Sequence, residues 1–138
     1  MIESLVALFI LGIFLTAAAL PFVKTSAKFC LIKAVREIHS RLNYARYKSI
    51  YQGTKVRLRV ESDSYLIEIW DQTLGIWSPE PKRYLKDAAL EANNTPTFHP
   101  VGTVSNLCTI HVKNSWGYYR ISLAISGRIK VTRVEPPT

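Results

Sequence analysis

The sequence predicts an α+β fold in which one long N-terminal helix precedes a head of antiparallel β-strands. Three observations predict it: an apolar run near the N-terminus, a continuation of that run at helical spacing, and a change to two-residue alternation after Gly53. The chain has 138 residues, of which 48% are hydrophobic. It is therefore long and apolar enough to build a core, and an intrinsically disordered chain is excluded.

The apolar run lies between Glu3 and Lys24 and carries no charge: SLVALFILGIFLTAAALPFV. A helix rises about 1.5 Å per residue, so this run would span about 30 Å, the thickness of the hydrocarbon core of a bilayer. A cleavable signal peptide is disfavoured, because its apolar stretch is shorter and its N-terminal flank is basic. A core helix that is apolar on every face would be too large for a domain of this size. We therefore expect residues 1–23 to form a membrane-spanning helix.

Residues 24–53 are expected to continue this helix as an amphipathic, basic segment that packs on the head. Apolar and small side chains step by three or four residues and predict a buried stripe. The stripe consists of Phe29, Ile32, Val35, Ile38, Leu42, Ala45 and Ser49. Gly53 is a plausible stop, and Pro21 predicts a kink because it removes one backbone hydrogen bond. The predicted helix is about 50 residues long, of which the first half is membrane-spanning.

Residues 54–138 are expected to form the β-rich head. KVRLRV (55–60) and YLIEIW (65–70) alternate strictly and predict an antiparallel hairpin. Further strands are expected at 97–104, 108–113, 118–125 and 128–134. The segment 71–97 contains three prolines and is expected to be mostly irregular, with a short strand or helical turn near 84–91.

The charge of the chain is strongly basic. Eighteen Lys and Arg residues against ten Asp and Glu residues give a net charge of +8. Such a balance favours nucleic acid, anionic lipid or an acidic protein surface as a partner. The basic residues between Lys24 and Arg59 fit either a solvated helix face or pairing with acidic residues of neighbouring heads.

The sequence gives little support for catalysis, so we expect no enzyme. His39, His99 and His111 lack metal-ligand spacing and have no evident acid partner. The two cysteines lack zinc spacing, and the G-x-S-x-G nucleophile motif is absent. We expect no metal and no cofactor.

The N-terminal residues MIESLVALFILGIF resemble the signature of type IV pilins and type II secretion pseudopilins. When Ile2-Glu3 is aligned on the Ile-Glu of that family, Gly12 falls on its helix glycine and Pro21 falls one residue past its proline. Three later blocks resemble the GspH/FimT group of minor pilins and pseudopilins: LNYARYKSIYQGTKVRL (42–58), TFHPVGTV (97–104) and ISGRIKV (125–131). The resemblance thus covers nearly the whole chain and implies the pilin-like fold.

Two features depart from the family. Its leader peptide is absent, and its acid is the fifth mature residue, whereas Glu3 is the third residue here. We expect that the sequence starts two residues inside the mature protein, at a Met in a Phe-Thr-Met-Ile-Glu context. The alternative is an unorthodox N-terminus, to which the processing and N-methylation of the family do not carry over.

The resemblance implies a structural subunit that polymerises with other pilin or pseudopilin subunits through its N-terminal helix. The filament would be a type IV pilus or a type II secretion pseudopilus. Before assembly the chain would cross the bacterial inner membrane once, with its head in the periplasm. Glu3 would pair with the terminal ammonium of a neighbouring subunit; the alternative is that it only lies at the level of the lipid headgroups. Gly12 and Pro21 would mark either local melting on assembly or a static bend.

The resemblance also suggests DNA as a partner. SGRIK (126–130) resembles the GRxR motif with which FimT-type pilins bind DNA during uptake, and Lys130 stands where the second Arg would be. Lysine keeps the charge but loses the planar fork of arginine. Arg128, Lys130 and Arg133 are therefore the candidate DNA-binding residues. The alternative is that these charges only protect an edge strand from aggregation.

The two cysteines leave two possibilities open. If the head lies in the oxidising periplasm, a disulfide between Cys30 and Cys108 would stabilise it by about 4 kcal/mol in the chain-entropy model. Otherwise both residues are buried thiols.

Overall fold

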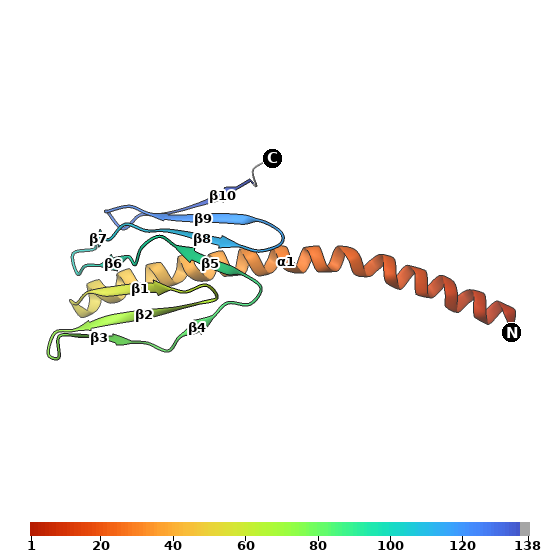
Figure 1. The fold of residues 1–138 in the computed structure, drawn as a ribbon, viewed down its shortest axis with the longest axis horizontal. Helices are drawn as coiled ribbons and strands as arrows, with labels where there is room; N and C mark the ends of the chain where they lie inside the picture. The colour runs from red at the N-terminus through yellow and green to blue at the C-terminus, as the bar shows by residue number, and fades with distance from the viewer. Residues whose placement is uncertain (136–138) are drawn as a thin grey trace.

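The computed structural model describes residues 1–135, apart from the side chains of residues 19–24. One helix, α1 (Ile2–Gln52), carries the N-terminus far from the head, and its second half lies against the strands (Figure 1). With 51 residues and about 1.5 Å of rise per residue, α1 is about 77 Å long. It ends at Gly53, whose φ of 65° and ψ of 26° are the left-handed backbone that glycine adopts without steric cost. The long helix predicted from the sequence is confirmed.

The second half of α1 packs on the head through one stripe of side chains. The buried members recur every three or four residues: Leu31, Ala34, Val35, Ile38, Leu42, Ala45 and Ser49. The predicted stripe is correct from Val35 onward but wrong at its start, because Phe29 is 65% exposed. A two-residue step turns an α-helix by about 200°, so Phe29 and the buried Leu31 lie on nearly opposite sides of it.

The first sheet contains the hairpin predicted at 55–70. Its strands are β1 (Val56–Val60), β2 (Ser64–Asp71), β3 (Ile76–Pro79), β4 (Arg83–Tyr84), β6 (Thr97–Phe98) and β7 (Val104–Ser105). They are ordered β3-β2-β1-β6-β7, with β4 also paired to β2, and all the pairs are antiparallel. Val56 pairs with Ile69, and Val60 pairs with Tyr65.

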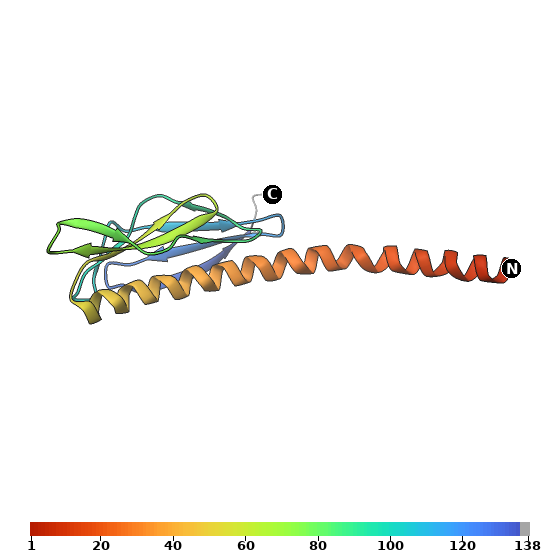
Figure 2. The same cartoon turned by 90° about the horizontal axis from the view of Figure 1, so that it is seen from below.

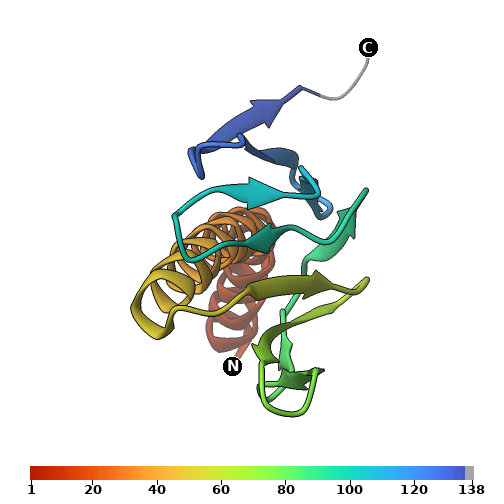
Figure 3. The same cartoon turned by 90° about the vertical axis from the view of Figure 1, so that its left-hand side faces the viewer.

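The second sheet is formed by the C-terminal strands. It contains β5 (Ala89–Ala92), β8 (Thr109–Lys113), β9 (Tyr118–Leu123) and β10 (Ile129–Val134). The order is β10-β9-β8-β5, again antiparallel, so β10 is an edge strand among the described residues. The view along α1 shows the strands of both sheets wrapping around one side of the helix (Figure 3).

Two strand predictions are wrong. The segment 97–104 is not one strand, because it turns back at Gly102 (φ 90°) and forms the short β6–β7 pair. The amide of His99 donates to the carbonyl oxygen of Thr103 across this turn. The segment 71–97 is more regular than expected, because it contains β3, β4 and β5. Its prolines lie at the end of β3 or between strands, where proline costs no ladder hydrogen bond.

The core lies between α1 and the two sheets (Figure 2). Each sheet contributes fully buried residues: Val56, Leu58 and Phe98 from the first, and Ile110, Val112 and Ile121 from the second. The Ser49 hydroxyl at the C-terminal end of the stripe lies 2.8 Å from the carbonyl oxygen of Thr54 and 3.0 Å from that of Phe98. It therefore ties α1 to both β6 and the chain leading to β1.

The membrane span predicted for residues 1–23 is not supported. Within the described part of the chain, no helix is both long and apolar enough to cross a bilayer. The backbone stays helical through residue 21. The side chain of Pro21 lies outside the described residues.

Candidate functional site

The N-terminal part of α1, residues 2–18, is exposed at every position. Its large apolar side chains from Ile2 to Leu15 are 47–78% exposed, and they lie on all sides of the helix. Soluble monomeric proteins rarely expose an apolar surface of this extent, and such patches commonly mark interaction sites. This surface is the first candidate site.

Two of the residues singled out from the sequence lie on this surface. Glu3 is exposed in the first turn of α1. A Cβ atom at Gly12 would meet no heavy atom within 4 Å, so this position leaves room for a second helix to approach closely. The Thr16 hydroxyl is satisfied locally, 2.9 Å from the carbonyl oxygen of Ile13. The assembly roles of Glu3, Gly12 and Pro21 stay predictions.

The β8–β9 hairpin holds the head against α1 where the apolar part ends. The side-chain amide of Asn114 donates to the carbonyl oxygen of Ala27 at 2.8 Å. Trp116, at the tip of the hairpin, has the Lys28 ammonium 5.6 Å and the Arg133 guanidinium 4.5 Å from its ring centroid. These cation–π contacts join α1, the hairpin and β10.

The three candidate DNA-binding residues do not lie on one surface. Arg128, Lys130 and Arg133 are all exposed. Lys130 pairs with Ser122 and Arg133 pairs with Tyr119, so the two-residue alternation puts them on opposite faces of β10. Arg133 points toward the helix side, where it stacks on Trp116. Lys130 lies on the outer face of β10, and Arg128 lies in the turn just before this strand.

Arg120 is a cation that the sequence reasoning did not single out. It is exposed on β9 opposite Thr132, and it is diagonal to Lys130 on the same face of the sheet. The alternation of YYRISL placed it on a strand face, but which strand lies beside β10 becomes visible only in the sheet order. His111 on β8 is the next residue in that row, and its ring stacks on Tyr118 at 5.2 Å.

The turn that carries Arg128 is held in place by Arg46 from α1. The Arg46 guanidinium donates to the carbonyl oxygens of Gly102 and Ser126, each at 3.3 Å. Gly127 lies between these contacts with a φ of 83°, and a Cβ there would lie 2.7 Å from Arg46 Nε and 2.9 Å from the Gly102 carbonyl oxygen. The glycine of the SGRIK block is therefore required by both backbone conformation and space.

The disulfide considered for Cys30 and Cys108 is not formed in the structure. Both thiols are free, and Cys108 is buried whereas Cys30 is half-buried. Cys108 Sγ lies 3.0 Å from the carbonyl oxygen of Asn94, whereas Cys30 Sγ lies 3.9 Å from Asp87 Oδ2. Burial raises the pKa of the Cys108 thiol, which keeps it protonated.

Two contacts between ionisable groups tie the helix to the head. The Tyr65 hydroxyl on β2 donates to the Glu37 carboxylate on α1. Burial, reinforced by this carboxylate, raises the pKa of Tyr65 to about 12. Burial opposes the charge of Lys48, but its hydrogen bonds to Glu80 and Tyr44 outweigh this effect and raise its pKa. In the part of the chain that the structure describes, no cluster of His, Cys, Asp and Glu could hold a metal ion.

The fold has counterparts among solved structures, although no protein-family model and no curated protein matches the sequence. The minor pseudopilin EpsH of the type 2 secretion system of Vibrio cholerae aligns in two structures, each with 12% identity and 94% of that chain covered. These alignments cover 72% and 75% of the present chain, with TM-scores of 0.60 and 0.62. The type IV minor pilin FimU of Pseudomonas aeruginosa aligns with 18% identity and a TM-score of 0.60, covering 74% of this chain and 87% of that one.

The chain has a pilin-like fold. The resemblance of MIESLVALFILGIF to type IV pilins and pseudopilins predicted this fold, and the structural likeness confirms it. At 12–18% identity the likeness establishes architecture, so the role of the chain has to be argued from its own surfaces.

Proposed function

We propose that the chain is a non-enzymatic structural subunit of a type IV pilus-like or type II secretion pseudopilus filament, and that it polymerises through its N-terminal helix. The observation that carries this proposal is the exposure of every large apolar side chain from Ile2 to Leu15 on a helix that projects beyond the head (Figure 1). The pilin-like fold supports it, because EpsH and FimU are a pseudopilin and a pilin.

The energetic argument concerns burial. Moving one large apolar side chain out of water contributes about 1.5–3 kcal/mol, and α1 exposes many of them. Packing against copies of the same helix removes this surface from water, and Gly12 lets such helices approach closely. Before assembly we place the subunit at the inner membrane, with the apolar helix in lipid and the head in the periplasm.

Glu3 has a specific part in this proposal. A carboxylate that enters an apolar bundle costs several kcal/mol unless it is paired or protonated. The terminal ammonium of a neighbouring subunit, which the family resemblance implies, would supply the charge. A Glu3→Leu variant should then be incorporated poorly into filaments, and unaltered incorporation would remove the pairing.

The decisive experiment for polymerisation compares two exposed apolar residues. Phe9 is 72% exposed on the apolar helix, and Leu74 is 67% exposed in the turn between β2 and β3. Phe9→Glu should abolish assembly of the full chain, as measured by filament imaging, while Leu74→Glu should assemble normally. Equal assembly of the two variants would contradict the proposal.

A second candidate function, DNA binding as a minor pilin, is favoured by the outer face of the second sheet. Arg128 lies two positions before Lys130, and Arg120 is diagonal to Lys130 across the β9–β10 pair. Cations gathered along one edge of a sheet can contact one phosphate backbone, and such binding is independent of sequence and weakened by salt.

The structure also supplies an internal control for this candidate. Replacing Arg128 and Lys130 by Gln should weaken binding in a gel shift at low salt. Arg133→Gln should change binding less, because Arg133 lies on the opposite face over Trp116. No shift at low salt, or equal effects of the two variants, would exclude the outer face as a DNA site.

A further inference from the structure

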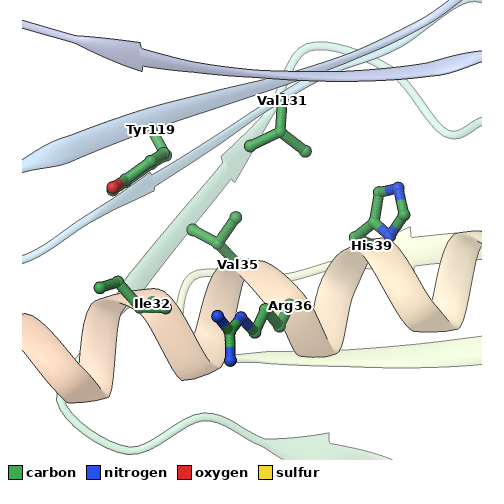
Figure 4. Close-up of a pocket in the computed structure, with 6 residues that line it drawn as sticks. All are labelled: Ile32, Val35, Arg36, His39, Tyr119 and Val131. Carbon is green, nitrogen blue, oxygen red and sulfur yellow. The ribbon is translucent and has the colours of Figure 1, made fainter.

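A trough runs along one flank of α1 beneath the edge of the second sheet. Its floor on α1 and its roof on β9 and β10 are separated by open space (Figure 4). The volume is about 340 Å³, and the lining residues are Ile32, Val35, Arg36, His39, Tyr119 and Val131. Val131 lies on the edge strand β10 and is 39% exposed in this trough.

The shape of the trough fits a helix. The four residues on α1 are spaced i, i+3, i+4 and i+7, which is the strip that one helix presents to another packed alongside it. Tyr119 and Val131 are diagonal neighbours on the inner face of the β9–β10 pair and close the trough from above. An apolar helix lying parallel to α1 would contact both walls.

The structure itself offers such a helix. Residues 2–18 are helical, and their large apolar side chains are exposed. They cannot reach the trough of their own molecule, because they belong to the same continuous helix and extend away from the head (Figure 2). The occupant must therefore come from another molecule.

Charge favours the same occupant. Arg36 lines the trough, and Arg133 lies on the inner face of β10 that forms its roof. The segment 2–18 carries one charged residue, the acid Glu3, and no base. A basic rim therefore meets a segment whose charge is acidic.

From these observations we propose that the trough receives residues 2–18 of a second copy of this chain. This inference rests on the proposed polymerisation and identifies the surface of the head that takes part in it. Placing residues 5–9 of one copy beside residues 35–39 of the next requires a shift of about 45 Å along the helix axis. The contact joins different surfaces on the two copies, so it repeats into an open filament.

Cross-linking between two separately tagged full-length proteins tests the contact, with Cys30→Ser in both. One protein carries Val131→Cys, and the other carries a single cysteine at Leu5, Val6, Leu8 or Phe9, which together sample one helical turn. Thr132→Cys replaces Val131→Cys in the matched control, because Thr132 is the next residue along β10 and points to the opposite face. The native Cys108 is 2% exposed and stays in place.

After detergent removal and mild oxidation, at least one of the four cysteines should cross-link to Val131→Cys about tenfold more than to Thr132→Cys. Assemblies that form without this preference would overturn the trough and leave polymerisation intact. Failure of both the wild-type chain and the chain with Cys30→Ser alone to assemble would overturn both proposals.

A second pair of variants measures the energetic weight of the contact. Val131→Glu places a charge in the trough, whereas Thr132→Glu places it on the outer face. Val131→Glu should raise the protein concentration needed for assembly by about tenfold or more, since an unpaired charge is costly to bury. Equal concentrations for the two variants, with both heads folded by circular dichroism, would overturn the proposal.

Discussion

The two ends of α1 share one backbone conformation but lie in opposite environments. From Leu31 to Ser49 the helix buries a stripe against two sheets, whereas from Ile2 to Leu15 its large apolar side chains are exposed. The buried part is amphipathic, and the exposed part is apolar on every face. One end is therefore stabilised within the molecule, while the other still has an apolar surface to bury.

This difference separates the requirements of folding from those of assembly. The head forms a closed core with the second half of α1 and does not use residues 2–18. Substitutions in the two regions should therefore change different measured quantities. Paired substitutions, one in each region, test whether folding and assembly are separate in this way.

The largest difference in stability is expected when one leucine in each region is replaced by alanine. Leu42 is fully buried, so Leu42→Ala should lower the free energy of unfolding of the head by about 2–5 kcal/mol. Leu11 is 55% exposed, so Leu11→Ala should leave that free energy nearly unchanged. Chemical denaturation in mild detergent measures both, and similar losses would show that the two ends of α1 fold as one unit.

A pH-dependent effect is expected in the packed region. Burial and the Glu37 carboxylate raise the pKa of Tyr65 from 10.0 to about 12. Below pH 10 both the folded and the unfolded chain keep this proton; above it the unfolded chain loses the proton first. Stability should therefore fall as the pH rises from 10 to 12, by about 2–3 kcal/mol in total from this group.

The Tyr65→Phe variant isolates this contribution, because other groups also titrate in alkali. The difference in unfolding free energy between wild type and variant should shrink across the same pH interval. A difference that stays constant from pH 9 to 12 would show that Tyr65 titrates normally.

The smallest effect concerns two glycines. Gly127→Ala should destabilise the head by about 1–3 kcal/mol, because the residue has a φ of 83° and its Cβ would collide with Arg46 and the Gly102 carbonyl oxygen. Gly12→Ala has open space around it and should leave the stability of the head unchanged. Thermal unfolding distinguishes them, and an unaffected Gly127→Ala protein would contradict the role given to Arg46.

Local sequence patterns predicted the elements whose periodicity is long or strict. Helix α1 was predicted from the apolar run, the stripe ending at Ser49 and the stop at Gly53. The β1–β2 hairpin was predicted from strict alternation. Phe29 was assigned to the buried stripe because it lies three residues before Ile32. That spacing fits more than one face of the helix, and only the packing against the head shows that the buried face includes Leu31 and not Phe29. The segment 97–104 looked continuous because its turn depends on the backbone of one residue, Gly102.

The candidate surfaces were harder to predict, because they combine distant segments. The exposed helix could be identified from composition, and Arg128 and Lys130 from the resemblance of SGRIK to the GRxR motif. Arg120 lies near Lys130 because β9 pairs with β10, which the sequence alone does not show. Arg133 lies apart from Lys130, on the other face of β10 over Trp116. The trough combines residues of α1, β9 and β10, and no local pattern in the sequence brings these three segments together.

Sedimentation of the full-length protein after detergent removal tests most directly the claim that residues 2–18 are buried by other copies. We predict that the wild-type chain forms assemblies much larger than a monomer, and that Phe9→Glu shifts the distribution toward single subunits. A wild-type chain that sediments as a stable, water-soluble monomer with its head folded would contradict the account.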